Sequence, residues 1–270
     1  MTRRARLRHV TTELLGSNLT ELLFDGASLR VIGCSVERPH LFVTFDHWRR
    51  ERASFPDYSP SNTALNHGYG HIYIQTAQND WFLNQDTIRL RGFLTELCQG
   101  KDSCSVGFSM GGYGALLFAN ALRLRRVLLL SPQYSIMQSK APYESGYQQE
   151  AALLDPTLDH LEPLDDGPRL QGIIAYDPRQ APQDRLHAEH IRTLHPDLKP
   201  VALPFGGHTA LKHMEGTGVT HEIMRAFIED DLSVGALRGV HGLIGRNSSR
   251  YKQRLKTYLD QRRARTGSAP

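Results

Sequence analysis

The chain has no long apolar run, few cysteines and little net charge, and each of these features argues against a class of protein. Its longest apolar stretch, Val127–Leu130 with its flanks, is of strand length, whereas a helix needs roughly 20 apolar residues to cross a bilayer. Polar residues interrupt Val10–Phe24 behind the arginine-rich start, so this segment is no signal-peptide core. We therefore expect an unexported, cytoplasmic protein without a transmembrane segment.

The 3 cysteines, Cys34, Cys98 and Cys104, are an odd number in 270 residues and lack the spacing of a metal site. This favours a reducing compartment over a disulfide framework. Cys34 and Cys104 stand in apolar, strand-like runs, and we expect them to be small core residues.

The net charge is only +4, but the cations gather at the two ends of the chain. They are Arg3, Arg4, Arg6 and Arg8 at the start, and Arg246, Arg250, Lys252, Arg254, Lys256, Arg262, Arg263 and Arg265 at the end. Solvated termini explain them most simply, although such ends could also bind an anionic partner such as nucleic acid, lipid or an acidic protein.

From Leu29 onward, short apolar runs alternate with helical patterns, which predicts an α/β fold with a mainly parallel, twisted sheet and helices on both faces. The expected strands are Leu29–Cys34, Leu41–Phe45, His71–Gln75, Ser103–Phe108, Arg126–Leu130, Gly172–Tyr176 and Pro200–Leu203. The expected helices are Thr87–Leu97, Gly112–Leu122, Gln183–Leu194 and Thr220–Asp230.

We divide the chain into a basic N-terminal segment (1–28), one α/β domain (29–232) and a basic, helical C-terminal extension (233–270). Residues 132–168 break the alternation with Pro, Gly, Tyr and several acids, and could form a short cap over a site or a plain surface insertion. In the C-terminal extension, Tyr251, Leu255, Tyr258 and Leu259 recur at helical spacing, and we expect this stripe to dock on the domain.

The most informative motif is Gly107-Phe108-Ser109-Met110-Gly111, which stands between an apolar strand and a small-residue helical pattern. In G-x-S-x-G the serine occupies a sharp strand-to-helix turn, the nucleophile elbow, and the glycines avoid clashes with the turning chain. Gly112 and Gly114 would then let the helix pack close to the sheet. The motif predicts that Ser109 is a covalent nucleophile.

Serine is a poor nucleophile unless a base, itself oriented by an acid, removes its proton. Gly206-Gly207-His208 follows a predicted strand, and its glycines give the imidazole a flexible approach, so His208 is the candidate base. His213 is the nearest rival, but it is expected in a helix. The paired histidines elsewhere in the chain lack a third ligand at a zinc-like spacing.

The turn at Gly107–Gly111, the acids after Tyr176 and Gly206–His208 together resemble the α/β-hydrolase superfamily, its esterase-like members in particular. The resemblance covers roughly Leu29 to Asp230. It implies a Ser-His-Asp triad in the chain order serine, acid, histidine, and no cofactor. It does not supply a substrate, because one fold hosts many reactions.

Two aspartates compete for the acid. Asp177 stands directly at the end of the strand Gly172–Tyr176, whereas Asp184 has a structural reason for its place, the first turn of a helix that starts at Pro182. We therefore favour Asp177, keep Asp184 as the alternative, and leave Asp155 or Asp159 as more remote candidates.

The resemblance also implies an oxyanion hole made of two backbone N–H groups. One is that of Met110, and the other comes from the loop after the strand Leu41–Phe45, where His47 or Trp48 is the plausible donor. No glycine stands in this loop, unlike in many relatives, and Asp46 could instead brace it.

These residues predict hydrolysis of a small-molecule or glycan acyl ester through an acyl-enzyme intermediate. Acyl transfer to a hydroxyl would use the same triad and is the alternative within this chemistry. The alternative from another class is a non-catalytic interaction module whose basic termini bind an anionic partner.

Overall fold

In the computed structural model, which describes residues 14–15, 18–52, 54–164, 169–208, 210–211 and 218–266, one sheet carries the fold. Its strands lie side by side in the order β1-β2-β3-β5-β4-β6-β7-β8-β9. They are β1 (Leu14–Leu15), β2 (Asn18–Asp25), β3 (Leu29–Cys34), β4 (His40–Phe45), β5 (Gly70–Thr76), β6 (Asp102–Phe108), β7 (Leu124–Leu130), β8 (Gln171–Tyr176) and β9 (Leu198–Ala202).

The sheet is mainly parallel, which confirms the predicted fold class. From β5 through β4 and on to β9 every neighbouring pair is parallel, while β3 runs antiparallel to both of its neighbours, β2 and β5. All of the predicted strands are present. β2 was not predicted, and it extends the sheet into the segment that we had placed outside the domain.

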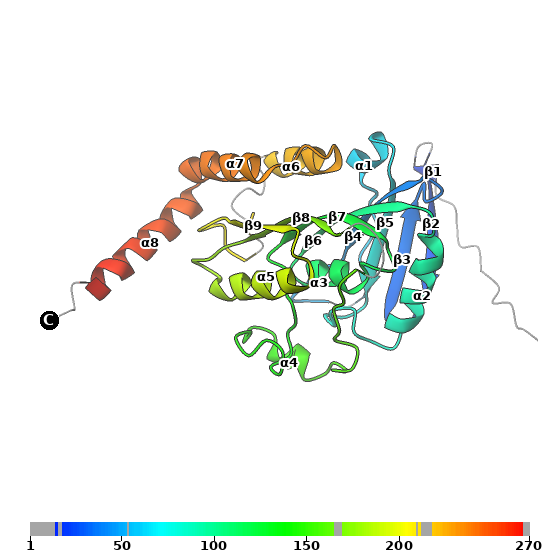
Figure 1. Cartoon of the computed structure of the whole chain (residues 1–270), viewed down its shortest axis with the longest axis horizontal. Helices are drawn as coiled ribbons and strands as arrows, with labels where there is room; N and C mark the ends of the chain where they lie inside the picture. The colour runs from blue at the N-terminus through cyan, green and yellow to red at the C-terminus, as the bar shows by residue number, and fades with distance from the viewer. Residues whose placement is uncertain are drawn as a thin grey trace, which may run out of the picture.

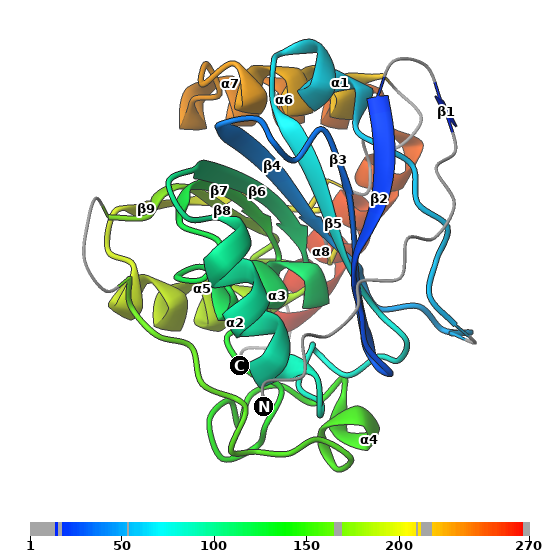
Figure 2. The same ribbon diagram turned by 90° about the vertical axis from the view of Figure 1, so that its right-hand side faces the viewer.

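Helices cover the sheet on two faces, as Figures 1 and 2 show: α2, α3 and α5 lie on one side, and α1, α6 and α7 on the other. The helices are α1 (Asn62–Asn66), α2 (Thr87–Leu97), α3 (Met110–Leu117), α4 (Gln148–Ala151), α5 (Pro182–Leu194), α6 (Val219–Ile228), α7 (Val234–Asn247) and α8 (Ser249–Thr266). The predicted helices correspond to α2, α3, α5 and α6.

The core splits into two apolar layers because successive strand residues point to opposite faces. In β4, Leu41 and Val43 pack with the helices of the α3 side, whereas Phe42 between them packs with the layer under α6 and α7. Near-continuous apolar strands are therefore buried on both sides, which is the pattern that the sequence showed. Cys34, Cys98 and Cys104 are all buried.

The C-terminal extension contributes to this packing. Leu237 of α7 is fully buried in the layer that also contains Phe227 of α6, so the core does not end at residue 232. From the end of α7, α8 runs past the β9 edge of the sheet (Figure 1). Its predicted stripe docks through Tyr251 and Tyr258, whose rings contact Phe205 at centroid distances of 5.5 and 5.6 Å.

Residues 132–164 form a long excursion that includes α4 and lies below the sheet in Figure 1. Within it, Asp159 is buried and accepts hydrogen bonds from Tyr113 of α3 and from Ser135. This anchors the excursion on the domain near the start of α3. Across the described residues, every helix is either too short or too polar to cross a membrane.

Candidate functional site

Ser109 stands on the sharp turn that joins β6 to α3. Its φ of 49° and ψ of −119° are a conformation that L-residues rarely adopt. The turn is possible because Gly107 has no side chain: a Cβ at that position would lie 2.6 Å from the Cα of Gly112. A Cβ at Gly111 would meet the carbonyl oxygen of Asp46 at 2.9 Å, so the first turn of α3 packs directly against the loop after β4.

Three side chains from distant parts of the chain form a hydrogen-bonded row. Nε2 of His208 lies 2.8 Å from Oγ of Ser109, and Nδ1 lies 3.2 Å from both carboxylate oxygens of Asp184. A carboxylate only accepts hydrogen bonds, so Nδ1 carries the proton of the neutral ring and Nε2 is free to accept the serine hydroxyl. Ser109 and Asp184 are buried, whereas the His208 side chain is 33% exposed.

Asp177, the aspartate favoured from the sequence, has different partners. One carboxylate oxygen accepts the backbone N–H groups of Arg179 and Gln180, and the other accepts that of Gly207 at 2.7 Å. Asp177 thus holds the loop that carries His208 but does not contact the imidazole. The structure brings the alternative, Asp184, to His208, because the first turn of α5 faces this loop. Asp155 accepts the hydroxyl of Thr157, and Asp159 accepts those of Ser135 and Tyr113, so both carboxylates have other partners.

Gln133, which the sequence analysis missed, contacts the serine from the other side. Its Oε1 is 3.2 Å from the indole Nε1 of Trp81, and an indole N–H is only a donor, which fixes the orientation of the amide. Nε2 of Gln133 therefore donates to Oγ of Ser109 at 3.1 Å. The serine hydroxyl has two acceptors within reach, Nε2 of His208 at 2.8 Å and Oε1 of Gln133 at 3.3 Å, and the contact to His208 is the shorter one.

The loop after β4 is braced by a buried carboxylate. Asp46 pairs with Arg49 at 2.6 Å and with Arg52 at 2.5 Å. Burial alone would raise the pKa of Asp46, but the hydrogen bonds and charges of Arg52 and Arg49 outweigh it and hold that pKa below its ordinary value. Asp46 is therefore an ionised anchor for the loop.

The same carboxylate changes the assignment of the oxyanion donor. The backbone N–H of His47 donates to Oδ1 of Asp46 at 2.9 Å, so it is already occupied. Among the described residues, no acceptor is recorded for the backbone N–H of Trp48 or for that of Met110. Of the two candidates from this loop, Trp48 is the one with a free donor.

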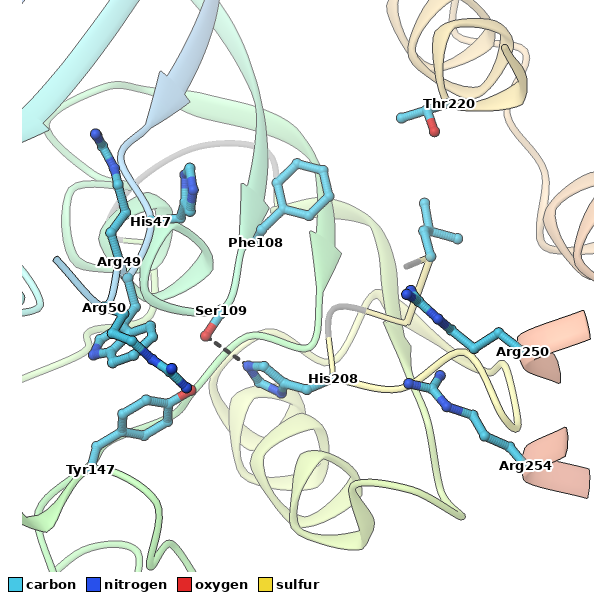
Figure 3. Close-up of a pocket in the computed structure, with 12 residues that line it drawn as sticks. His47, Arg49, Arg50, Phe108, Ser109, Tyr147, His208, Thr220, Arg250 and Arg254 are labelled. Carbon is cyan, nitrogen blue, oxygen red and sulfur yellow. Dashed lines mark hydrogen bonds between the residues drawn. The ribbon is translucent and has the colours of Figure 1, made fainter. Parts of the chain in front are cut away.

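A cavity of about 980 Å³ opens over Ser109 and His208. Figure 3 shows the two side chains pointing at each other, with Arg49 and Arg50 on one side of the pair and Arg250 and Arg254 on the other. The lining residues come from segments that are far apart in the sequence: His47, Trp48, Arg49, Arg50, Phe108, Ser109, Tyr147, His208, Leu211, Thr220, Arg250 and Arg254.

The excursion 132–164 supplies one wall of this cavity through Tyr147. Its ring packs edge-on against Trp81 at 4.9 Å and lies 6.3 Å from the ring of Trp48. Glu150 of α4 accepts a hydrogen bond from the indole of Trp48 at 2.7 Å, which ties the excursion to the loop after β4. Burial raises the pKa of Tyr147, so its phenol stays protonated near neutral pH.

Sequence reasoning missed Gln133, Tyr147, Arg250 and Arg254 as members of the site. Gln133 carried a weak signal, since it comes three residues after the end of β7, and sites in open α/β sheets gather at the carboxyl ends of the strands. Tyr147 and the two arginines gave none, because their positions depend on tertiary packing. His213, the rival base, lies outside the described residues, and no cluster of three or more His, Cys, Asp or Glu suited to a metal ion occurs within them.

Neither a protein-family model nor a curated protein sequence matches this chain. Solved structures of very different sequence do resemble it. The Gap123 complex of Streptococcus agalactiae is 11% identical with a TM-score of 0.50, over 78% of this chain and 45% of that one. MGS-M1, an α/β hydrolase from a Medee basin deep-sea metagenome library, is 11% identical with a TM-score of 0.46, over 80% and 97%. The capsule O-acetyltransferase of Neisseria meningitidis serogroup A is 14% identical with a TM-score of 0.46, over 79% and 97%. At such identities the likeness concerns the fold alone.

Proposed function

We propose that this chain, which has the α/β-hydrolase fold, is a serine hydrolase that cleaves carboxylic esters through an acyl-enzyme intermediate. The observation that carries the proposal is the row Ser109–His208–Asp184, with both hydrogen bonds of the imidazole in place. A nucleophile, a base and an orienting acid at these distances are what acyl transfer from an ester requires.

In the first half-reaction, Oγ of Ser109 attacks the ester carbonyl while Nε2 of His208 accepts the hydroxyl proton. The imidazolium that forms is stabilised by Asp184, which is buried and already hydrogen-bonded to Nδ1. Collapse of the tetrahedral intermediate breaks the bond to the alcohol oxygen, and Nε2 returns the proton to the departing alcohol. The acyl group is then esterified to Ser109.

We assign the oxyanion to the backbone N–H groups of Met110 and Trp48. Met110 begins α3, whose N-terminal end carries a partial positive charge, and the loop of Trp48 packs against that same turn. The ion pairs of Asp46 with Arg49 and Arg52 hold this loop before substrate arrives. Preorganised donors of this kind contribute about 3 to 4 kcal/mol each to stabilisation of the transition state.

In the second half-reaction, water attacks the acyl-serine with His208 as the base, and the carboxylic acid leaves. We favour hydrolysis over transfer to another alcohol, because one third of the His208 side chain is exposed and the base is therefore beside solvent. A small-molecule or glycan ester can reach the serine because the cavity is open and partly apolar, with Trp48, Phe108 and Tyr147 beside it.

The proposal is tested by turnover of nitrophenyl acetate under steady-state conditions. We expect hydrolysis by the wild type and a loss of at least about 10³-fold in kcat for Ser109→Ala. Ser233→Ala, at the N-cap of α7, is the matched control and should retain wild-type turnover. Equal turnover by Ser109→Ala and the wild type would show that this serine is not the nucleophile.

A further inference from the structure

The cavity over Ser109 is rich in cations and, among its described lining residues, contains no carboxylate. Four of the lining residues are arginines, and they differ in how their charge is balanced. Arg49 is paired with Asp46, so its charge is neutralised within the protein. For Arg50, Arg250 and Arg254, no ion pair with a carboxylate is recorded in the described part of the chain.

Arg250 and Arg254 reach the cavity from the same face of α8, because residues four apart are neighbours on a helix surface. Arg254 is held in place: its Nη1 donates to the carbonyl of Phe205 at 3.0 Å, and its guanidinium lies against Gly207. Arg250 stands in the first turn, where the helix dipole disfavours a cation and no acid compensates it. Helix stability therefore does not account for Arg250.

The position of these two arginines relative to the triad gives their role. Gly207, which Arg254 contacts, immediately precedes His208 in the chain, and Figure 3 shows both arginines on the His208 side of Ser109. In ester cleavage the alcohol accepts its proton from Nε2 of His208, so the leaving alcohol must lie on that side as well. A group attached to the alcohol thus extends towards α8.

From this geometry we infer that the substrate is an ester whose alcohol portion carries a phosphoryl group, which Arg250 and Arg254 bind. The inference rests on the proposed function and adds the substrate class. Guanidinium groups suit it, because their planar fork donates two hydrogen bonds to phosphate oxygens. The exposed end of Arg250 is free to do so, while the bond of Arg254 to Phe205 leaves its other N–H groups available.

The experiment compares three esters by titrating the acid that each releases: 1-O-acetylglycerol, 1-O-acetylglycerol 3-phosphate and glycerol monosuccinate. The first is neutral, the second has its charge on the alcohol and the third has it on the acyl group. We expect kcat/KM for the acetylglycerol phosphate to exceed that for acetylglycerol by at least about tenfold, the contribution of one charge-assisted hydrogen bond. The monosuccinate should show no such advantage.

The variant Arg250→Ala should reduce the ratio of kcat/KM for acetylglycerol phosphate to kcat/KM for acetylglycerol about tenfold. Arg250→Lys should restore part of this ratio, because lysine returns the positive charge but not the planar pair of donors. Lys252→Ala is the matched control: it removes the same charge from an exposed position of α8 that does not line the cavity, and it should keep the ratio.

Two results would overturn the inference and leave the proposed function intact. One is Ser109-dependent hydrolysis with equal kcat/KM for the neutral and phosphorylated acetyl esters, and the other is a preference for the monosuccinate. A preference for the phosphorylated ester that survives Arg250→Ala would contradict the assignment of Arg250 as a phosphoryl ligand. A folded protein that hydrolyses nitrophenyl acetate but none of the three would overturn the inference alone, whereas inactivity on nitrophenyl acetate as well would reject the proposed function.

Discussion

At the scale of single residues, the two aspartates that follow β8 have hydrogen-bond partners other than those that the sequence analysis favoured. Asp184 accepts Nδ1–H of His208, whereas Asp177 accepts three backbone N–H groups, including that of Gly207. From the sequence we named both and favoured Asp177, because an acid in the first turn of a helix already has a structural reason to be there. What decides between them is the direction in which the Gly206–His208 loop approaches the sheet.

Substituting each aspartate by asparagine separates these roles. Asp184→Asn should lower kcat for nitrophenyl acetate about 10³- to 10⁴-fold with little change in stability, since an asparagine amide disfavours the tautomer that accepts the serine proton. Asp177→Asn should instead lower stability by about 1 to 3 kcal/mol, because it removes acceptors for buried N–H groups. Steady-state kinetics and urea unfolding of both variants measure this. A larger loss of kcat in Asp177→Asn would contradict the assignment.

Gln133 is expected to act by positioning Ser109, through the hydrogen bond from its Nε2. Gln133→Met keeps the volume of the side chain but removes the donor, so kcat should fall about tenfold while KM changes little. The control Trp81→Phe deletes the indole that orients the amide and should have a smaller effect on kcat, because the amide itself remains. An unchanged kcat in folded Gln133→Met would show that the contact has no catalytic consequence.

At the scale of secondary-structure elements, the strands that the sequence predicted are those with near-continuous apolar runs, from β3 to β9. β2 escaped prediction because it lies near the edge of the sheet, where its residues are only partly buried and alternate irregularly, with a bulge between Leu22 and Phe24. Periodicity detects a strand that is regularly buried on one face, and a partly buried strand with a bulge lacks that regular pattern. α8 was predicted as a docking helix, but nothing in its pattern indicated that it would reach the site.

The helix α8 is expected to position the loop that carries His208. Tyr251 and Tyr258 pack on Phe205, and Arg254 hydrogen-bonds its carbonyl, two residues before Gly207. A chain that ends at Asn247 should lose about 2 kcal/mol of stability through exposure of Phe205 and the tyrosines, and several-fold in kcat for a neutral ester. Thermal unfolding and ester kinetics of the truncated chain test this. Unchanged kinetics would show that the loop is ordered without α8.

The strand β5 holds a histidine that makes stability depend on pH. His71 is buried; its Nδ1 accepts the N–H of Ser61 at 3.1 Å, and Nε2 lies 2.9 Å from the hydroxyl of Thr44. Burial lowers its pKa to about 4 from the ordinary value of 6.5. Between pH 6.5 and about pH 4, the His71 imidazole therefore binds a proton in the unfolded chain but stays neutral in the folded chain.

It follows that acidification destabilises the fold in this range, and His71 alone accounts for about 2 kcal/mol between pH 7 and pH 5. His195, whose pKa burial also lowers to about 4, adds to the loss. Urea unfolding at both pH values should show the decrease in the wild type and a smaller one in His71→Gln, although that variant is less stable throughout. An equal decrease in the two proteins would place the titrating groups elsewhere.

At the scale of the whole molecule, the site exists only in the folded chain. Its serine, base, acid and cavity walls come from the β4 loop, the β6–α3 turn, the excursion 132–164, the start of α5, the β9 loop and α8. The fold class and the candidate nucleophile depend on local sequence patterns, whereas the walls and the charge of the cavity are produced by packing. The candidate site is therefore complete only in the folded domain together with its C-terminal extension, which supplies Arg250 and Arg254 to the cavity.

The central claim, that Ser109 is a nucleophile activated by His208, is tested most directly with a fluorophosphonate probe and intact-mass spectrometry. The account predicts one covalent adduct per wild-type chain, mapped by peptide sequencing to Ser109, no adduct in Ser109→Ala, and labelling at least about 10³-fold slower in His208→Ala. An unlabelled but folded wild type, or an adduct that persists in Ser109→Ala, would contradict it.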